Sequence, residues 1–148
     1  MDSSTTERRI TLRLIAYWER LRGDRTMPTE ADIDPSDLQD LWGYCFLIHV
    51  KDIDKPDYNY TYLGMEIEKA YQGELTDDDI GAVASPNASK LAGSYARVIE
   101  TRKPLIDEGE FVNLRNETVK YRQCLLPLGE DNKVDAIFGG MRFKIFPS

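Results

Sequence analysis

Residues 105–145 read LIDEGEFVNLRNETVKYRQCLLPLGEDNKVDAIFGGMRFKI and contain three segments rich in β-branched and aromatic residues. These segments predict strands over roughly 105–114, 118–128 and 133–145. The turns between them, RNE and GEDN, are short and polar. Because a parallel pair needs a crossover of about a dozen residues, both turns predict antiparallel hairpins. The chain is therefore expected to end in a three-stranded antiparallel sheet.

The longest central helix is predicted directly before these strands. Apolar residues recur at three- and four-residue spacing between the SP dipeptide at 85–86, which opens a helix, and the KP dipeptide at 103–104, which ends one. The positions on this stripe are Ala88, Leu91, Ala92, Tyr95, Val98 and Ile99. A shorter helical segment is predicted over 64–73, between two glycines. The apolar stripe of the long helix needs a sheet to cover it.

Two further strands are predicted upstream, CFLIHV at 45–50 and YNYTYL at 58–63, joined by a turn that contains Pro56. The first is apolar at nearly every position, which is typical of a strand covered on both faces. Five mostly antiparallel strands, with helices between the second and third, predict an α+β fold. We expect the central helices on one face of the sheet and an N-terminal helix on part of the other.

The N-terminal helix is predicted over residues 5–22, because Ser4 and Glu7 have capping-box spacing and Gly23 ends the pattern. Its apolar stripe suggests a second use, self-association into a homodimer. The stripe residues proposed for that contact are Ile10, Leu14, Tyr17 and Leu21. A short helix is also expected over 35–42, which Asp34 would cap. Without repeats or linkers, residues 1–148 are expected to form one domain with its core over 28–146.

Composition excludes several classes of function. The chain of 148 residues has a formal charge of −7, which disfavours nucleic acid as a partner. It has no apolar run of about 20 residues and no signal-peptide core, so neither a membrane span nor export is expected. Cys45 and Cys124 form no CxxC motif and lie in apolar segments, which is typical of buried, reduced thiols. We therefore expect a cytoplasmic protein.

Several short motifs, weak one by one, occur together in a recognisable order. They are Trp18, Ile33-Asp34-Pro35, Phe46-Leu47-Ile48, Tyr62-Leu63-Gly64, Tyr71-Gln72-Gly73-Glu74-Leu75-Thr76 and Leu125-Leu126-Pro127-Leu128. In this order and spacing the chain resembles a family of small, often stand-alone bacterial PAS domains, over roughly residues 8–145. The resemblance implies a five-stranded antiparallel sheet and a role in sensing or protein interaction, without catalysis or a resident cofactor.

The resemblance also implies a pocket between the sheet and the central helices that can hold a small molecule. Tyrosine hydroxyls could orient such a ligand, because Tyr60 and Tyr62 are expected to share one face of their strand and Tyr71 and Tyr95 to point inward. Cys124, on a sheet strand, completes the set of pocket candidates. The alternative is that all five are ordinary core residues. The chain carries no attached kinase, cyclase or DNA-binding module, so we expect its output to pass to a downstream signalling protein.

Candidates for catalysis are few. His49 is the only histidine, which disfavours a zinc site, and a lone histidine in an apolar strand is more often a hydrogen-bonded structural residue than a haem ligand. Cys45 and His49 lie too far apart along one strand to form a nucleophilic dyad. The competing hypothesis is a small-molecule enzyme, isomerase-like or hydrolase-like, on a cone-shaped α+β fold. Such folds place their long helices before the sheet, which differs from the order predicted here.

Overall fold

A computed structural model describes residues 3–50, 58–71, 88–112 and 115–146, with the side chains of 3–9, 58–60, 71, 88–93 and 111 outside the description. Its strands form one five-stranded sheet in the order β2-β1-β5-β4-β3, and every neighbouring pair is antiparallel. The strands are β1 Cys45–Val50, β2 Tyr58–Leu63, β3 Leu105–Val112, β4 Thr118–Glu130 and β5 Lys133–Phe146. The predicted α+β fold with an antiparallel five-stranded sheet is confirmed.

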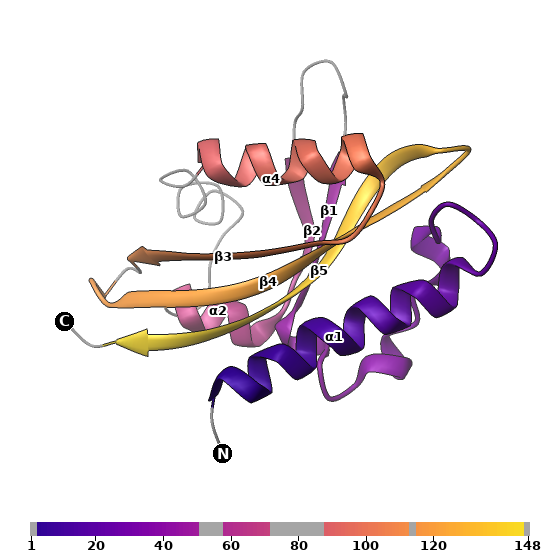
Figure 1. Cartoon of the computed structure of the whole chain (residues 1–148). Coiled ribbons are helices and arrows are strands. Elements are labelled where there is room, and N and C mark those ends of the chain that lie inside the picture. The colour runs from indigo at the N-terminus through magenta and orange to yellow at the C-terminus, as the bar shows by residue number, and fades with distance from the viewer. Residues whose placement is uncertain (1–2, 51–57, 72–87, 113–114, 147–148) are drawn as a thin grey trace.

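Three α-helices and three 3-10 helices accompany this sheet in the described residues. They are α1 Ser3–Arg22, η1 Glu30–Asp32, η2 Pro35–Leu38, η3 Trp42–Tyr44, α2 Met65–Tyr71 and α4 Ala88–Thr101. Both α2 and α4 lie between β2 and β3, as predicted. The predicted end of the first of these helices and the predicted start of the second fall in residues 72–87, which lie outside the description. In Figure 1, α4 lies on one side of the sheet and α1 on the other.

The strand register assigns side chains to these two sides. Cys45 and Cys124 both pair with Gly140, and Leu125 pairs with Gly139. Successive residues of a strand point to opposite faces. Gly140 and its two partners therefore share one face of the sheet, and Gly139 and Leu125 share the other. A Cβ atom at Gly140 would clash with Cδ1 of Leu14 in α1. We name the face of Gly140 the α1 face and the face of Gly139 the α4 face.

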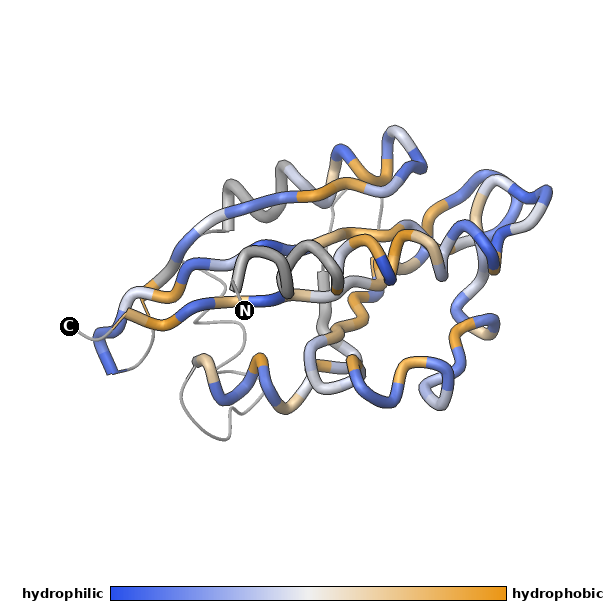
Figure 2. Tube along the Cα trace, turned by 60° about the horizontal axis from the view of Figure 1, so that its bottom comes forward, coloured by the Kyte–Doolittle hydropathy of each residue, from blue (hydrophilic) through white to orange (hydrophobic). Residues whose placement is uncertain are grey.

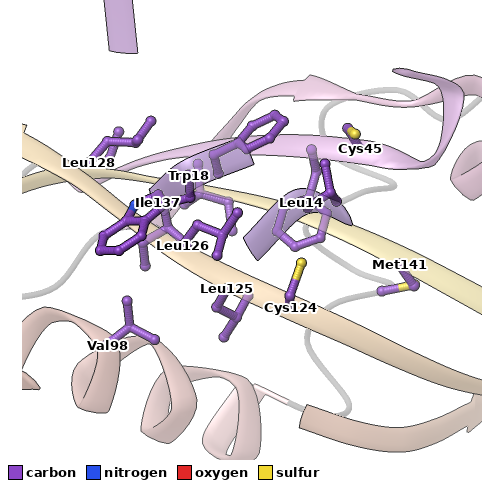
Figure 3. Packing of buried hydrophobic residues seen from close by; sticks show 14 of the residues in the cluster. Leu14, Trp18, Cys45, Val98, Cys124, Leu125, Leu126, Leu128, Ile137 and Met141 are labelled. Atoms are coloured by element: carbon purple, nitrogen blue, oxygen red, sulfur yellow. The ribbon is translucent and has the colours of Figure 1, made fainter. Parts of the chain in front are cut away.

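The α1 face is tightly closed. Leu14 and Trp18 are buried against the sheet, and Trp18 Nε1 donates a hydrogen bond of 2.7 Å to the carbonyl oxygen of Pro127 in β4. Figure 3 shows Leu14 and Trp18 beside Leu126 and Cys124. The prediction that the N-terminal helix covers the other side of the sheet is therefore confirmed.

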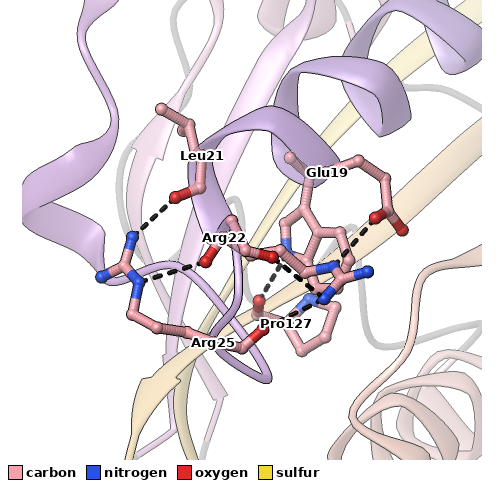
Figure 4. Close-up of polar contacts among 7 residues, drawn as sticks. Glu19, Leu21, Arg22, Arg25 and Pro127 are labelled. Atoms are coloured by element: carbon pink, nitrogen blue, oxygen red, sulfur yellow. Dashed lines mark hydrogen bonds and ion pairs between the residues drawn. The ribbon is translucent and has the colours of Figure 1, made fainter.

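The C-terminal end of α1 is fixed by arginine side chains. Arg25 donates from Nη2 to the carbonyl of Leu21 at 2.6 Å and from Nε to the carbonyl of Arg22 at 3.2 Å. Arg22 in turn pairs with Glu19 one turn earlier, at 2.8 Å (Figure 4). Cations at this end satisfy carbonyls that the helix leaves unpaired and complement the helix dipole. The helix therefore ends in a defined loop beside β4.

The segment that contains the 3-10 helices packs against the outer side of α1 and is joined to it by polar contacts. Tyr17 donates its hydroxyl proton to Asp37 Oδ2 at 2.9 Å, and the same hydroxyl accepts from the backbone N–H of Asp34 at 3.0 Å. Arg13 pairs with Asp40 at 2.6 Å, and this hydrogen bond lowers the pKa of the Asp40 carboxyl. Three polar links therefore join α1 to the segment that precedes β1.

The α4 face is covered by α4, a shorter helix than α1. Tyr95 and Val98 of α4 are buried, and Figure 3 shows Val98 next to Leu125 on the underside of β4. The sheet is thus covered on both sides at β1, where Cys45, Phe46 and Ile48 are all buried. This confirms the prediction drawn from the continuous apolar run of that strand.

Three predictions need correction. The helix expected over 35–42 is two separate 3-10 helices, η2 and η3, with Asp34 Oδ1 accepting from the N–H of Ser36 at 3.0 Å at the start. The first helix begins at Ser3 and not at residue 5. The stripe predicted for self-association faces the chain's own core: Ile10, Leu14 and Tyr17 are at most 5% exposed, and Leu21 packs beside them. A dimer formed through α1 would therefore need other residues.

A hollow with a volume of about 400 Å³ lies between the loop after α1 and the β4–β5 hairpin. Its lining mixes polar and apolar surface, and Figure 2 shows hydrophilic segments at this end of the tube. The hairpin turn itself is set by Asp131 and Asn132, which have φ values of 53° and 63°. Two consecutive residues with positive φ match the right-handed twist of the flanking strands.

Candidate functional site

A group of polar side chains lies on the α4 face, where the sheet is otherwise apolar. Gln123 of β4 is 1% exposed and donates from Nε2 to Oδ2 of Asp107 in β3 at 3.4 Å. Ser94 of α4 donates from Oγ to the same carboxylate oxygen at 3.4 Å. We name Ser94, Asp107 and Gln123 the Gln123 cluster. It joins the helix and two strands through one carboxylate.

Position in the sheet explains why these residues meet. Asp107 and Gln123 are directly paired in the β3–β4 register, and Leu105 and Leu125 form the next pair on the same face. Tyr95, adjacent to the cluster in sequence, is buried against the sheet. Burying the Gln123 amide among apolar side chains is costly unless it finds a partner, and the partly buried Asp107 supplies one. The hydrogen bonds within the cluster are long, so its groups retain capacity for a stronger partner.

The surroundings of the cluster match the general composition of small-molecule sites. Such sites are lined mostly by apolar and aromatic side chains, with a few placed polar groups that set orientation. Val98 and Leu125 supply the apolar part here, and the cluster supplies an amide, a hydroxyl and a carboxylate. The sequence prediction missed these three residues. The signal that could have revealed them is Gln123, a polar residue at an inward position of an apolar strand.

The predicted pocket residues do not form one group. Tyr95 is buried under α4, in agreement with its predicted inward orientation. Tyr62, in contrast, pairs with Leu47, which pairs in turn with Phe138. Phe138 is two residues from Gly140 in β5, so all three side chains lie on the α1 face. Cys124 lies on that same face, beside Gly140. The sheet therefore separates Tyr95 from Tyr62 and Cys124, and the last two cannot line a cavity under α4.

Tyr62 is part of an aromatic stack. Its ring lies 4.5 Å from the ring of Trp42, and its hydroxyl donates to the carbonyl oxygen of Trp42 at 2.7 Å. Burial raises the pKa of Tyr62 to about 12, with a smaller contribution from the Cys45 thiol. The hydroxyl is thus engaged in holding η3 against β2.

A β-bulge interrupts the pairing of β1 and β2 next to Tyr62. The register shifts between Leu47 and Ile48, so that Leu47 pairs with Tyr62 whereas Ile48 pairs with Tyr60. The extra residue in β2 breaks the two-residue period on which the prediction of a shared face rested. The side chains of Tyr60 and Tyr71 lie outside the described part of the chain, so their place in the predicted pocket stays a prediction.

Both cysteines are buried and free. Because each pairs with Gly140 from opposite sides, their Cα atoms are two strand spacings apart, about 10 Å, which is too far for a disulfide. Burial raises the pKa of Cys124 to about 12 and raises that of Cys45 as well. Neither thiol is activated as a nucleophile, in keeping with the structural role predicted for both.

His49 forms a surface contact. Its Nε2 lies 2.8 Å from Glu30 Oε2, and its side chain is 39% exposed. The predicted hydrogen-bonded role is present, but the residue is less buried than the apolar strand suggested. Nearby, burial and then repulsion from Glu30 raise the pKa of Asp135. Within the described ranges, no three acidic, histidine or cysteine side chains gather as a group that could hold a metal ion.

No helix among the described residues is long and apolar enough to cross a membrane. A search of curated proteins found no match to the chain. A sequence model described as a PAS domain matches residues 6–142, which is nearly the whole chain. PAS domains are typically non-catalytic and serve in sensing or protein interaction. The order of strands, the helices between β2 and β3 and this match agree, and the chain belongs to the PAS domain family.

Proposed function

We propose that this PAS domain is a non-catalytic sensor that binds a small molecule between α4 and the sheet and signals through a partner protein. The observation that carries the proposal is the Gln123 cluster, a set of polar groups at the centre of an apolar face. Polar groups in such a place are the means by which apolar pockets recognise one orientation of a ligand. The domain acts as one unit, and its two unpaired thiols support a reducing cytoplasmic compartment.

The chemistry of the cluster limits the ligand. The Gln123 amide offers a donor and an acceptor, the Ser94 hydroxyl offers both, and the Asp107 carboxylate accepts hydrogen bonds. A ligand that donates to Asp107 would replace two bonds of 3.4 Å with a shorter one. We therefore expect a mainly apolar small molecule with a hydrogen-bond donor at one end.

Transmission depends on α4 having two arrangements. The Ser94–Asp107 bond between α4 and the sheet is long, at 3.4 Å, whereas α1 has shorter contacts, 2.7 Å from Trp18 to Pro127 and 2.6 Å from Arg13 to Asp40. Elements with few strong contacts open and shift at lower cost. A ligand that binds one arrangement better shifts the population toward it, and a partner can read that shift.

Native mass spectrometry of the protein purified from its own cells tests the proposal. We expect a retained small molecule in the wild type and its loss in Gln123→Leu. Cys124→Ala is the matched control, because residue 124 is adjacent in the same strand but faces α1, so this variant should keep the ligand. A wild type that carries no ligand, or a ligand that Gln123→Leu retains and Cys124→Ala loses, would overturn the proposal. An empty protein would instead favour an adaptor without a ligand.

A further inference from the structure

Towards the C-terminal end of β5, the α1 face carries four cations that face one another in pairs. Arg122 pairs with Arg142, and Lys120 pairs with Lys144, in the β4–β5 register. All four follow the alternation that places Gly140 on the α1 face. We name these four side chains the basic ladder. Like charges directly opposite each other destabilise an antiparallel pair, so the stability of the hairpin does not explain them.

Within the sheet, acidic residues flank the basic ladder on one side. In β3, Glu108 is opposite Arg122 and Glu110 is opposite Lys120. On the other side, β1 ends its pairing with β5 at Gly140, so no strand continues the rows there. Each row therefore reads acid, cation, cation from β3 to β5. Two cations of β5 have no acid beside them in the sheet.

The ion pairs of the described residues agree with this unbalanced pattern. Within the described part of the chain, Arg142, Lys120 and Lys144 have no carboxylate oxygen within 4.0 Å. Arg122 is engaged on its β3 side, where its buried Nε lies 3.5 Å from Glu108 Oε1. The other three cations of the ladder therefore have unused capacity to bind an anion.

Aromatic rings hold these cations in place at the surface. The guanidinium of Arg142 lies 4.5 Å from the ring centroid of Tyr44, and Lys120 and Lys144 lie 5.2 Å and 5.9 Å from that of Phe146. Phe146 is itself 39% exposed. Figures 1 and 2 both show the C-terminal end of β5 extending past α1. Lys120 and Lys144 of the ladder are exposed, and Arg122 and Arg142 are partly exposed.

The charges of the molecule identify the kind of partner. A second copy docked by the same face would place cations against cations, because a two-fold interface pairs each patch with itself. The overall charge of −7 and the flanking Glu108 and Glu110 oppose a long polyanion such as nucleic acid. A short acidic segment avoids the repulsion between like cations and also the repulsion from Glu108 and Glu110. Its carboxylates need to contact only the cations of β5.

We propose that the basic ladder binds an acidic segment of a partner protein, whose carboxylates complete the rows beside Arg142 and Lys144. An apolar residue in that segment would contact Phe146. The inference deepens the proposed signalling function by giving its partner a chemistry, and it stands whether or not a ligand occupies the α4 face. Failure of one proposal is therefore distinguishable from failure of the other.

Fluorescence anisotropy with the full chain tests the ladder, using a labelled peptide of alternating Glu and Ser with one central Leu as the probe. We expect Arg142→Glu with Lys144→Glu to weaken binding by at least about tenfold, because exposed charge pairs each contribute a fraction of a kcal/mol and reversal adds repulsion. The matched control reverses two exposed lysines elsewhere, Lys103→Glu with Lys133→Glu, and should stay within about twofold of the wild type. Both doubles take the formal charge from −7 to −11, since each replaces two cations by two anions.

A second variant separates binding from stability. Lys144→Glu alone places an acid opposite Lys120, so the urea midpoint of unfolding should rise or stay the same while peptide affinity falls. Equal losses in the ladder and control doubles would overturn the proposal. So would a wild type that does not bind the peptide, or one that prefers phosphatidylserine vesicles or a single-stranded oligonucleotide to it.

Discussion

The two faces of one sheet differ in how they are held. On the α1 face, Trp18 donates to a strand carbonyl at 2.7 Å, and polar links from Tyr17 and Arg13 extend the closure to the neighbouring segment. On the α4 face, a longer bond of 3.4 Å runs from Ser94 to Asp107. Strand β4 contributes residues to both faces, so neighbouring side chains along it alternate between the contact with α1 and the contact with α4.

This difference shows how a small domain can combine rigidity with response. A strand buried on both sides has no solvent-facing side on which to place a polar residue at low cost. The α1 face has thiols and leucines at its centre, and the α4 face has Gln123. We infer that α1 fixes the sheet, and that α4 is the element whose position responds to a ligand.

The largest expected effect comes from removing the anchor of the α1 face. Trp18→Ala should lower the free energy of unfolding by about 3–5 kcal/mol, because it leaves a large cavity beside Leu14. Trp18→Phe keeps most of the apolar contact but leaves the Pro127 carbonyl unpaired, and should cost about 1–3 kcal/mol. Urea unfolding followed by circular dichroism measures both. An alanine variant as stable as the wild type would show that α1 does not fix the sheet.

A smaller effect is expected where helix and sheet approach most closely. Gly140→Ala should destabilise by about 1–3 kcal/mol, because its new methyl group meets the end of the Leu14 side chain. Leu14→Val removes the contacting atom, so the double variant should be more stable than the sum of the single effects predicts. Strictly additive effects in a double-mutant cycle would show that the two residues do not touch.

The smallest effect concerns the aromatic stack on the α1 face. The pKa of Tyr62 rises on folding from 10.0 to about 12, so its neutral form is favoured in the folded state. The associated stability is complete below pH 10 and is lost as the pH rises toward about 12, since the unfolded chain ionises first. Tyr62→Phe should show a shallower decline over that window in pH-dependent urea unfolding. An unchanged slope would mean that other groups cause the alkaline loss.

The fold was largely predictable from the sequence. Strands at 45–50 and 58–63 were predicted with their observed bounds, because their β-branched and aromatic runs are sharply bordered by turn residues. The short hairpin turns fixed the order of the last three strands in the same way. The 35–42 segment was predicted less well, since two 3-10 helices and one short α-helix share the same spacing of apolar residues.

The site was predicted less well, for reasons of register. Tyr62 lies beside a bulge in the β1–β2 pair, and nothing in YNYTYL signals a bulge. The face of Cys124 depends on which strand lies beside Gly140, and that is a tertiary property. The apolar stripe of α1 suited a partner helix and the sheet equally well, and the sheet of the same chain covers it.

Hydrogen exchange measured on the protein as purified, and again after unfolding and refolding to remove any bound molecule, tests the contrast between the faces most directly. We expect the refolded protein to exchange faster at Ser94–Thr101 and Leu105–Asp107, and at an unchanged rate along the Thr11–Arg22 part of α1. Faster exchange along α1 with an unchanged α4 would contradict the assignment of the responsive face.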